Sequence, residues 1–339
     1  MYRVVSAMIL CPLPDRNPTT AGGLSTKNIS GNNNRVAPPF AVSLVTSSCR
    51  QPRNMVRIVD LRRRNSDYSS EYAANFSVCV PPIFGKFDGV SDLVEFIETS
   101  RVLGAQKFQF YAESVGTQVA ACLREYVRRG IVDVQPWTLP SDIAAVIFYH
   151  GQILAISECL YRLMYRTRYL VIQDIDEFVV PMNTDSWQSM LNGIVENSHF
   201  DSDRIASYSF RNRFFLIKLR EDVNNFTSGN GIVSQLKTLS VTTADKYLFP
   251  FTVRSKVMAR PERILIWHVH LILDSSLVCR GDKNIEVDAK IGQLFHYKRG
   301  ISVASTMTLP RMKQFEPLIL RRLNVATAAI CLTGDYIFP

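Results

Sequence analysis

The stretch Tyr169-Leu-Val-Ile-Gln-Asp-Ile-Asp-Glu-Phe-Val-Val-Pro181 decides the fold class, because it places three carboxylates between two apolar runs. The run that begins at Tyr169 predicts a buried strand, and Asp174 and Asp176 come directly after it. In an open parallel sheet, ligands bind beyond the carboxyl ends of the strands. The sequence therefore predicts that this acidic pair lies at the ligand-binding edge of a sheet.

Upstream of this stretch, strand and helix patterns alternate with short connections. Short apolar runs predict strands over residues 76–81, 107–111, 131–137 and 169–173. Helical spacing of apolar residues predicts helices over residues 91–103, 115–129 and 151–165, the first capped by Ser91 and closed by Gly104. Regular alternation of this kind is typical of a largely parallel sheet with helices on both faces, so we expect an α/β fold.

Downstream of Pro181 the pattern is less regular. We expect a helix over residues 186–196, strands within 204–217, 252–258 and 264–273, a polar surface loop over 220–246 and an amphipathic helix over 310–323. The first 70 residues are rich in polar residues and proline and show no persistent period. These patterns predict a poorly ordered tail over 1–70, a globular domain over 71–305, and a carboxyl-terminal helix and tail over 306–339.

The composition favours a folded protein with an anionic partner. Hydrophobic residues make up 47% of the 339 residues, which is enough for a sizeable core. The formal net charge of +9 favours phosphate-bearing substrates, acidic membranes or nucleic acid. We interpret the basic run Arg62-Arg63-Arg64 as a solvated loop. A basic nucleic-acid-binding protein stays a rival interpretation, although the sequence lacks the clustered aromatic and basic signature of such proteins.

The seven cysteines do not decide the cellular compartment. None of them forms a C-x-x-C pair, which argues against a zinc knuckle or a thioredoxin-type site. We interpret Cys79, Cys122 and Cys159, which lie in apolar stretches, as small core residues.

Other signals for the compartment are weak. The acceptor pattern for N-glycosylation begins at Asn28, Asn75 and Asn225, and it matters only if the chain enters the secretory pathway. The longest early apolar stretch, residues 4–10, is far shorter than the ~20 residues that a membrane-spanning helix needs. We therefore expect membrane association only if an N-terminal anchor is missing from this chain.

The acidic stretch has two interpretations on its residues alone. The chain contains a control for the same spacing in Asp201-Ser-Asp203, a polar segment that we interpret as a turn. Asp174 and Asp176 differ because they lie between two buried runs, where carboxylates are costly to desolvate unless a cation or N–H donors pair with them. Mg²⁺ and Mn²⁺ take oxygen ligands and bridge carboxylates to phosphates. The pair is either a metal–phosphate site or a strand-end turn of salt-bridged acids.

Three histidines are candidate metal ligands. His268 and His270 flank Val269 on the strand expected over 264–273, so both side chains should share one face. Histidine commonly binds transition ions, but an ordinary hydrogen-bonded histidine explains each of these positions as well. The segment His296-Tyr-Lys-Arg adds cations of the kind that a diphosphate leaving group needs, or it forms a solvated basic loop.

Several motifs together resemble glycosyltransferase family 92. The resemblance begins at Phe76-Ser-Val-Cys-Val-Pro-Pro-Ile-Phe-Gly and Phe108-Gln-Phe-Tyr, continues through Gly151-Gln and Cys159-Leu-Tyr-Arg, and is strongest at Asp174-Ile-Asp-Glu-Phe. Looser matches follow at Arg254-Ser-Lys-Val, His268-Val-His and His296-Tyr-Lys. The resemblance covers roughly residues 72–300.

Similarity to this family implies a GT-A fold, a divalent cation such as Mn²⁺ and a UDP-sugar donor. It also implies a glycan or glycoprotein acceptor, galactose transfer from UDP-galactose with inversion, a location in the Golgi lumen and no nucleic-acid partner. By this resemblance Asp174 faces the nucleotide, Asp176 binds the metal, and Gln152 and Lys298 contribute to the donor site. His270 is the preferred second metal ligand, with His268 and His296 as rivals.

The sequence also departs from the family pattern. Ala112-Glu-Ser lacks the Asp or Asn expected after Tyr111, and Ser157-Glu158 replaces a common Asn-Asp pair. A catalytically inactive homologue that binds glycan or nucleotide is therefore a second rival interpretation. Inverting transfer requires a base for the acceptor hydroxyl. The sequence does not choose among the candidate bases Glu221, Asp222, Asp245, Glu262 and Asp274.

Overall fold

The computed structural model of the chain describes residues 41–42, 56–57, 72–144, 146–197, 201–217, 236–275 and 282–326. It divides the chain into one unit of residues Ala7–Ser66 and a larger unit of Met1–Ser6 with Asp67–Pro339. In the smaller unit, the described strands β1 (Ala41–Val42) and β2 (Val56–Arg57) pair antiparallel. The predicted boundary at residue 70 stays a prediction, since most of the residues before it lie outside the described ranges.

A seven-stranded sheet forms the centre of the larger unit. Its strands are, in order, β14 (Lys283–Glu286), β8 (Ile205–Phe210), β11 (Lys256–Ala259), β6 (Thr167–Ile172), β3 (Ala74–Ile83), β4 (Lys107–Ala112) and β5 (Val132–Pro136). All neighbouring pairs are parallel except those that β11 forms with β6 and β8. The expected mostly parallel sheet is therefore confirmed.

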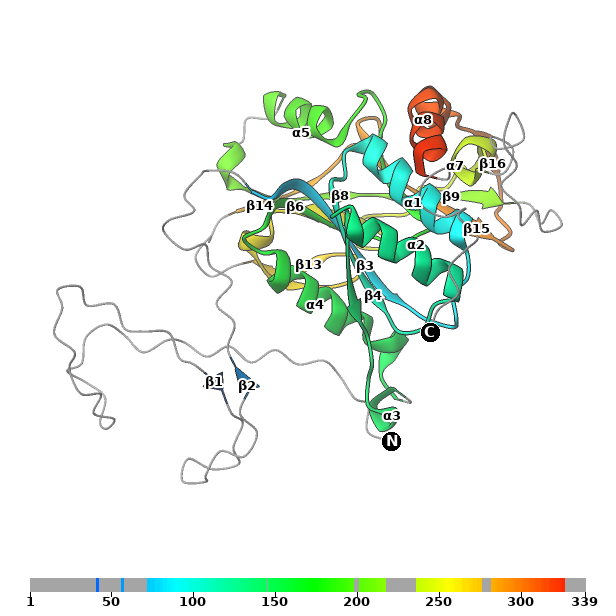
Figure 1. The fold of residues 1–339 in the computed structure, drawn as a ribbon. Coiled ribbons are helices and arrows are strands. Elements are labelled where there is room, and N and C mark those ends of the chain that lie inside the picture. Colours follow the sequence, from blue (N-terminus) through cyan, green and yellow to red (C-terminus); the bar gives the residue numbers. More distant parts are fainter. Residues whose placement is uncertain are drawn as a thin grey trace, which may run out of the picture. The chain divides into compact units, whose positions relative to one another are not determined.

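Helices cover both faces of this sheet, as predicted. Alternate residues of β3 point to opposite sides: Val78 packs in the core with α1 (Val90–Leu103) and α2 (Thr117–Arg128), whereas Cys79 packs with α4 (Gln152–Leu163). In Figure 1, α1 and α2 run along the sheet, and α8 (Glu316–Ala326) lies beside α1. Because α8 buries Ile319 and Leu323 in the same core, the carboxyl-terminal helix packs as part of this unit.

A second, five-stranded sheet places the acidic turn at a corner. Its order is β16 (Thr306–Thr308), β10 (Thr243–Asp245), β9 (Asn212–Ile217), β15 (Gly292–Arg299) and β7 (Glu177–Pro181). Strand β6 belongs to the first sheet and β7 to the second. Residues 173–176 therefore make the connection between the two sheets.

The remaining described elements surround these two sheets. They are α3 (Ser141–Ala144), α5 (Trp187–Glu196), α7 (Lys237–Ser240), β12 (Ile264–Trp267), β13 (Ile272–Ser275) and the short 3₁₀ helices Phe148–Gly151, Ser202–Arg204, Pro261–Arg263 and Arg311–Phe315. Within the described part of the chain, no helix combines the length and the apolar character that crossing a membrane requires.

Three local predictions were wrong. Helix α1 begins at Val90 after Gly89, so Ser91 lies inside the first turn and does not cap the helix. The single strand expected over 264–273 is a hairpin of β12 and β13, because residues 268–271 turn the chain back on itself. The loop expected over 220–246 contains α7 and β10, while residues 218–235 lie outside the described ranges.

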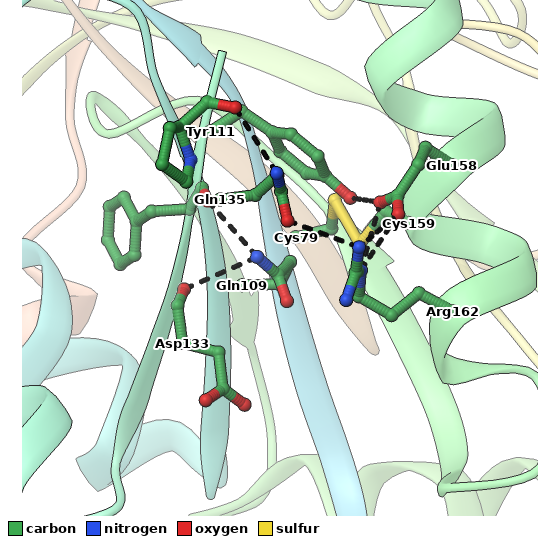
Figure 2. A network of polar contacts seen from close by, with 10 residues as sticks. Cys79, Gln109, Tyr111, Asp133, Gln135, Glu158, Cys159 and Arg162 are labelled. Atoms are coloured by element: carbon green, nitrogen blue, oxygen red, sulfur yellow. Dashed lines mark hydrogen bonds and ion pairs between the residues drawn. A yellow bond between two sulfur atoms is a disulfide. The ribbon is translucent and has the colours of Figure 1, made fainter.

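Two kinds of bond fasten α4 to the central sheet. A disulfide joins Cys79 on β3 to Cys159 on α4, so the interpretation of these residues as simple core cysteines was incomplete. Figure 2 shows Tyr111 of β4 pointing at Glu158, to which its hydroxyl donates a hydrogen bond. Arg162 pairs with Glu158 and donates to Gln135 at 3.2 Å. The position of α4, and of the segment that precedes it, is thus tightly fixed.

Candidate functional site

The acidic turn is held rigid by its own hydrogen bonds. The Gln173 backbone N–H donates to the Cys79 carbonyl at 3.1 Å, and the Gln173 side-chain amide donates to the Glu177 carbonyl at 3.0 Å. The Glu177 backbone N–H donates to the Asp174 carbonyl at 3.1 Å, while the Asp174 N–H donates to the Glu177 carboxylate at 3.1 Å. The turn therefore fixes Asp174 and Asp176 at the carboxyl end of β6.

A buried lysine joins two carboxylates of this turn. Lys256, on β11, is 1% exposed, and its Nζ lies 3.1 Å from Asp174 Oδ2 and 3.0 Å from Glu177 Oε2. Burial alone would lower the pKa of Lys256, but the charges of Asp174 and Glu177 raise it above the ordinary value. Lys256 is therefore a permanent positive charge beneath the turn, where an unpaired carboxylate would be costly.

A histidine joins the third carboxylate, Asp176, to Glu177. His296, on β15, has its Nε2 at 3.3 Å from Asp176 Oδ2 and its Nδ1 at 3.2 Å from Glu177 Oε1. Burial opposes the charged form, but the contact with Asp176 and the charge of Glu177 raise the pKa of His296 above its ordinary value. Asn212, on β9, lies 3.2 Å from Nδ1 on the buried side.

Further cations surround Asp176. Lys298 Nζ lies 3.8 Å from Asp176 Oδ2, and buried Lys237, on α7, lies 2.7 Å from Asp92 Oδ1. Burial opposes ionisation of Asp176, but His296, Lys298 and Lys237 together hold its pKa below the ordinary value. The side chains of Asp174 and Asp176 are still 38% and 33% exposed, so both carboxylates can be reached from solvent.

Several buried polar atoms around the turn have no hydrogen-bond partner. Among the described residues, these atoms include Gln173 Oε1, Asn212 Oδ1, Ser255 Oγ and His268 Nδ1. Buried polar groups in native proteins are nearly always paired with protein, water or ligand. Their concentration next to the exposed carboxylates is typical of a site that a polar ligand completes.

The structure places the three candidate histidines in different surroundings. His268 and His270 lie in the turn of the β12–β13 hairpin and not on one face of a strand. His270 Nδ1 donates to the Ser255 carbonyl at 3.1 Å, which leaves its Nε2 as the free acceptor. Burial and the charge of Lys256 lower the pKa of His270, so this histidine is neutral at pH 7. Only His296 among the three has a recorded contact with Asp176.

A strained arch precedes α4 on the same side of the sheet. Tyr149 and His150 have φ angles of 47° and 55°, a region that residues other than glycine seldom adopt. His150 stacks on Phe84, which directly follows β3, with ring centroids 3.7 Å apart. Burial and the charges of Asp174 and Asp176 raise the pKa of Tyr149, which locates the arch near the acidic turn.

Glu113 and Glu158, which lie in the two segments that depart from the family pattern, both make contacts within the structure. Glu113 Oε2 lies 2.7 Å from His150 Nδ1 and so supports the arch, while Glu158 binds Tyr111 and Arg162 under α4. Gln152, the first residue of α4, is 5% exposed, and no recorded contact joins it to the acidic pair. Of the predicted donor-site residues, the structure thus brings together Asp174, Asp176 and Lys298.

The structure also separates the candidate bases. Asp245 is buried on β10, Glu262 pairs with Arg260 at 3.1 Å, and Asp274 lies on β13. Glu221 and Asp222 lie outside the described residues.

The control motif behaves as predicted. Asp201 caps a 3₁₀ helix by accepting a hydrogen bond from the Asp203 N–H at 3.0 Å. This second acidic pair therefore stabilises an exposed turn.

Comparison with known proteins identifies the family. The family model described as Glycosyltransferase family 92 matches residues 74–325, and the chain belongs to that family. A β-1,4-galactosyltransferase of Caenorhabditis elegans is 30% identical over 139 residues, which cover 40% of this chain and 32% of that protein. A galactan β-1,4-galactosyltransferase of Arabidopsis thaliana is 25% identical over 138 residues, which cover 40% of this chain and 27% of that protein. The matches thus span about a third of these relatives or less.

Solved structures give only distant matches. TarS of S. aureus in complex with UDP-GlcNAc has a TM-score of 0.33 and 12% identity, over 78% of this chain and 68% of that chain. Glucosyl-3-phosphoglycerate synthase from Mycobacterium tuberculosis in complex with Mn²⁺ and UDP has a TM-score of 0.28 and 11% identity, over 77% and 82%. These TM-scores are too low to support an argument about function. The fold class instead follows from the observed sheet and from membership of the family.

Proposed function

We propose that the protein is a glycosyltransferase that moves galactose from UDP-galactose to a glycan acceptor with inversion. Family membership and the names of the two relatives support sugar transfer and the choice of sugar. The observation that carries the proposal is the acidic turn: two partly exposed carboxylates stand at the sheet edge above buried Lys256 and His296. Such an arrangement suits a ligand that carries both phosphates and a cation.

The residues around Asp176 fit a divalent cation. Among the described residues, no group of three or more His, Cys, Asp and Glu side chains converges on a metal position. Mg²⁺ and similar ions at phosphate sites, however, commonly take one or two protein ligands and complete their shell with substrate phosphates and water. Asp176 Oδ2 and His296 Nε2, which lie 3.3 Å apart, supply such a pair once the imidazole has released its Nε2 proton. Glu177, at 3.2 Å from the other ring nitrogen of His296, stands where a carboxylate usually orients a metal-binding histidine.

We therefore assign the second ligand position to His296 in place of His270. When bound, a divalent cation would offset the charge that develops on the departing diphosphate. An oxygen-plus-imidazole pair suits Mn²⁺ better than Mg²⁺, because imidazole is the softer ligand.

The residues of the chain have separate tasks in this proposal. Asp174, held by Lys256, faces the nucleotide, and Lys298 supplies a positive charge beside the diphosphate. The stacked rings of Phe84 and His150 and the neighbouring Tyr149 border the donor side. An acceptor hydroxyl must lose its proton as it attacks the anomeric carbon. The residue that accepts this proton is not assigned.

Secretory location is part of the proposal. The disulfide between Cys79 and Cys159 supports it, because disulfides persist mainly in oxidising compartments. Asn75, the described member of the three sequons, is exposed at the start of β3. We propose the Golgi lumen as the location, and we expect no nucleic-acid partner.

One experiment tests the proposal against its main rival. Purified protein is incubated with UDP-galactose and Mn²⁺, and release of UDP is measured with and without oligosaccharide acceptors. We expect slow donor hydrolysis and faster transfer, together with a rise in melting temperature that UDP and Mn²⁺ produce jointly. Donor binding without any turnover would instead identify an inactive homologue, and absence of donor binding would contradict the proposal.

A further inference from the structure

A cluster of aromatic rings extends from the acidic turn across the second sheet. His296, which contacts Asp176, lies with its ring centroid 5.1 Å from that of Phe214 on β9. Phe214 lies 5.1 Å from Phe249, and Phe249 lies 5.0 Å from Tyr247. The outermost ring, Tyr247, is 56% exposed. The rings thus form a continuous path from Asp176 to an exposed tyrosine.

The backbone that carries these rings is firmly held. Arg211 donates hydrogen bonds to the carbonyls of Phe249 and Leu248 at 2.8 and 2.7 Å. The Phe249 N–H donates to the Asn212 carbonyl at 3.0 Å, and the Tyr247 N–H donates to Asp245 Oδ1 at 2.9 Å. An exposed tyrosine is common in itself. Here, however, hydrogen bonds hold the backbone that carries the ring of Tyr247.

An exposed arginine lies over the same rings. The guanidinium carbon of Arg254 is 5.5 Å from the Phe214 centroid and 5.7 Å from that of Phe249. Arg254 and nearby Thr252 have φ angles of 59° and 69°. Residues held in this region cluster at ligand-binding sites, where the surrounding structure maintains the strain. The structure therefore presents aromatic rings and the N–H donors of an arginine side by side.

We propose that Tyr247, Phe249 and Arg254 bind the acceptor glycan, with a pyranose ring stacked on Tyr247 and its hydroxyls bonded to Arg254. The inference rests on the proposed glycosyltransferase function and names its acceptor site. A sugar ring presents a face of C–H bonds, which packs on the electron-rich face of an aromatic ring. The five N–H donors of arginine suit the hydroxyls at the rim of the same sugar.

The position of the aromatic cluster favours binding of the acceptor over binding of the donor. The features assigned to the donor, Phe84 and Tyr149, lie beyond the strands of the first sheet, whereas Phe214 belongs to the second sheet. The acidic turn connects the two sheets, and His296, at the inner end of the ring cluster, contacts Asp176 in this turn. A sugar seated on Tyr247 would thus approach the turn along the second sheet.

The test compares Tyr247→Ala, Tyr247→Phe and Arg254→Gln with wild type. Binding to a panel of oligosaccharides ending in galactose, fucose, mannose or N-acetylglucosamine is measured by calorimetry with UDP and Mn²⁺ present, and transfer from UDP-galactose is measured on the same panel. Tyr165→Ala is the matched control, because this tyrosine is 38% exposed and lies between α4 and the amino end of β6.

We expect Tyr247→Ala to raise the Kd and KM for the acceptor by at least about fivefold, the scale of an aromatic contact. Arg254→Gln should raise the Kd and KM for the acceptor as well. In Tyr247→Phe and in the control, both values should stay within twofold of wild type. The affinity for UDP should not change in any of these variants. Unchanged acceptor affinity in Tyr247→Ala, a loss of UDP affinity in that variant, or no oligosaccharide binding by wild type would each overturn the proposal. Glycan binding that depends on Tyr247 without any transfer would refute the enzymatic function alone.

Discussion

The Nε2 atom of His296 lies 3.3 Å from the Oδ2 atom of Asp176, although the two residues are 120 positions apart in the sequence. Parallel pairing of β15 with β9 and antiparallel pairing with β7 bring His296 opposite Glu177. The site is therefore assembled by the register of the second sheet at the point where the first sheet ends.

The first prediction concerns this histidine. His296→Ala should weaken Mn²⁺-dependent UDP binding at least tenfold, because even residues that only orient a metal ligand contribute 10–100-fold to affinity. His270→Ala is the matched control and should stay within twofold, since His270 bonds to the Ser255 carbonyl instead. Calorimetric titration of both variants measures the difference. A larger loss in His270→Ala would return the ligand role to His270.

The second prediction concerns the buried lysine. Lys256→Met should destabilise the fold by about 3–5 kcal/mol, because it removes the buried lysine that pairs with the 3% exposed side chain of Glu177. Lys283→Met, at an exposed position on β14, should change stability by less than about 0.5 kcal/mol. Urea unfolding gives both values. Equal stability of the two variants would show that the lysine is not a structural counter-charge.

The third prediction concerns the disulfide. The double variant Cys79→Ala with Cys159→Ala removes a covalent bond between residues 80 positions apart. The chain-entropy model therefore predicts that the free energy of unfolding falls by an amount on the order of 4 kcal/mol. Thermal unfolding under non-reducing conditions should show a lower melting temperature for the variant. If a reductant lowers the melting temperature of wild type and variant equally, this disulfide does not stabilise the fold.

The fourth prediction is a pH dependence. Burial and Lys256 lower the pKa of His270, so the folded protein binds this proton less readily than the unfolded chain. The contribution of His270 to stability is therefore full above its ordinary pKa of 6.5 and is lost as the pH falls from that value through the lower pKa of the folded protein. Unfolding free energies of metal-free wild type and His270→Gln, measured between pH 8 and 5.5, should diverge in favour of the variant on the acid side. Parallel curves would contradict the assigned protonation state.

The local pattern was enough to predict much of the first sheet. The strands and helices from residue 74 to 172 follow the predicted alternation, because short apolar runs form the buried strands and apolar residues at helical spacing form the helices. Asp174 and Asp176 were found by the same logic, since they follow a buried strand. The control pair Asp201 and Asp203 shows that the spacing alone would not have distinguished them.

The partners of the acidic pair could not be predicted in this way. Lys256 and His296 reach the turn through sheet registers that no local period encodes. The segment Ile264–Leu273 is apolar apart from His268 and His270 and contains no glycine or proline, so no turn-forming residue in it signals the turn. The disulfide of Cys79 and Cys159 likewise depends on how α4 packs on β3.

The central claim is that Asp176 holds the metal and diphosphate of the donor, and Asp176→Asn tests it most directly. Its side chain is partly exposed, so the variant should keep the melting temperature of wild type within a few degrees. Calorimetry with UDP and Mn²⁺ should show at least a tenfold loss of affinity in Asp176→Asn and none in the control Asp203→Asn. Metal-dependent UDP binding that is unchanged in a folded Asp176→Asn protein would contradict the account.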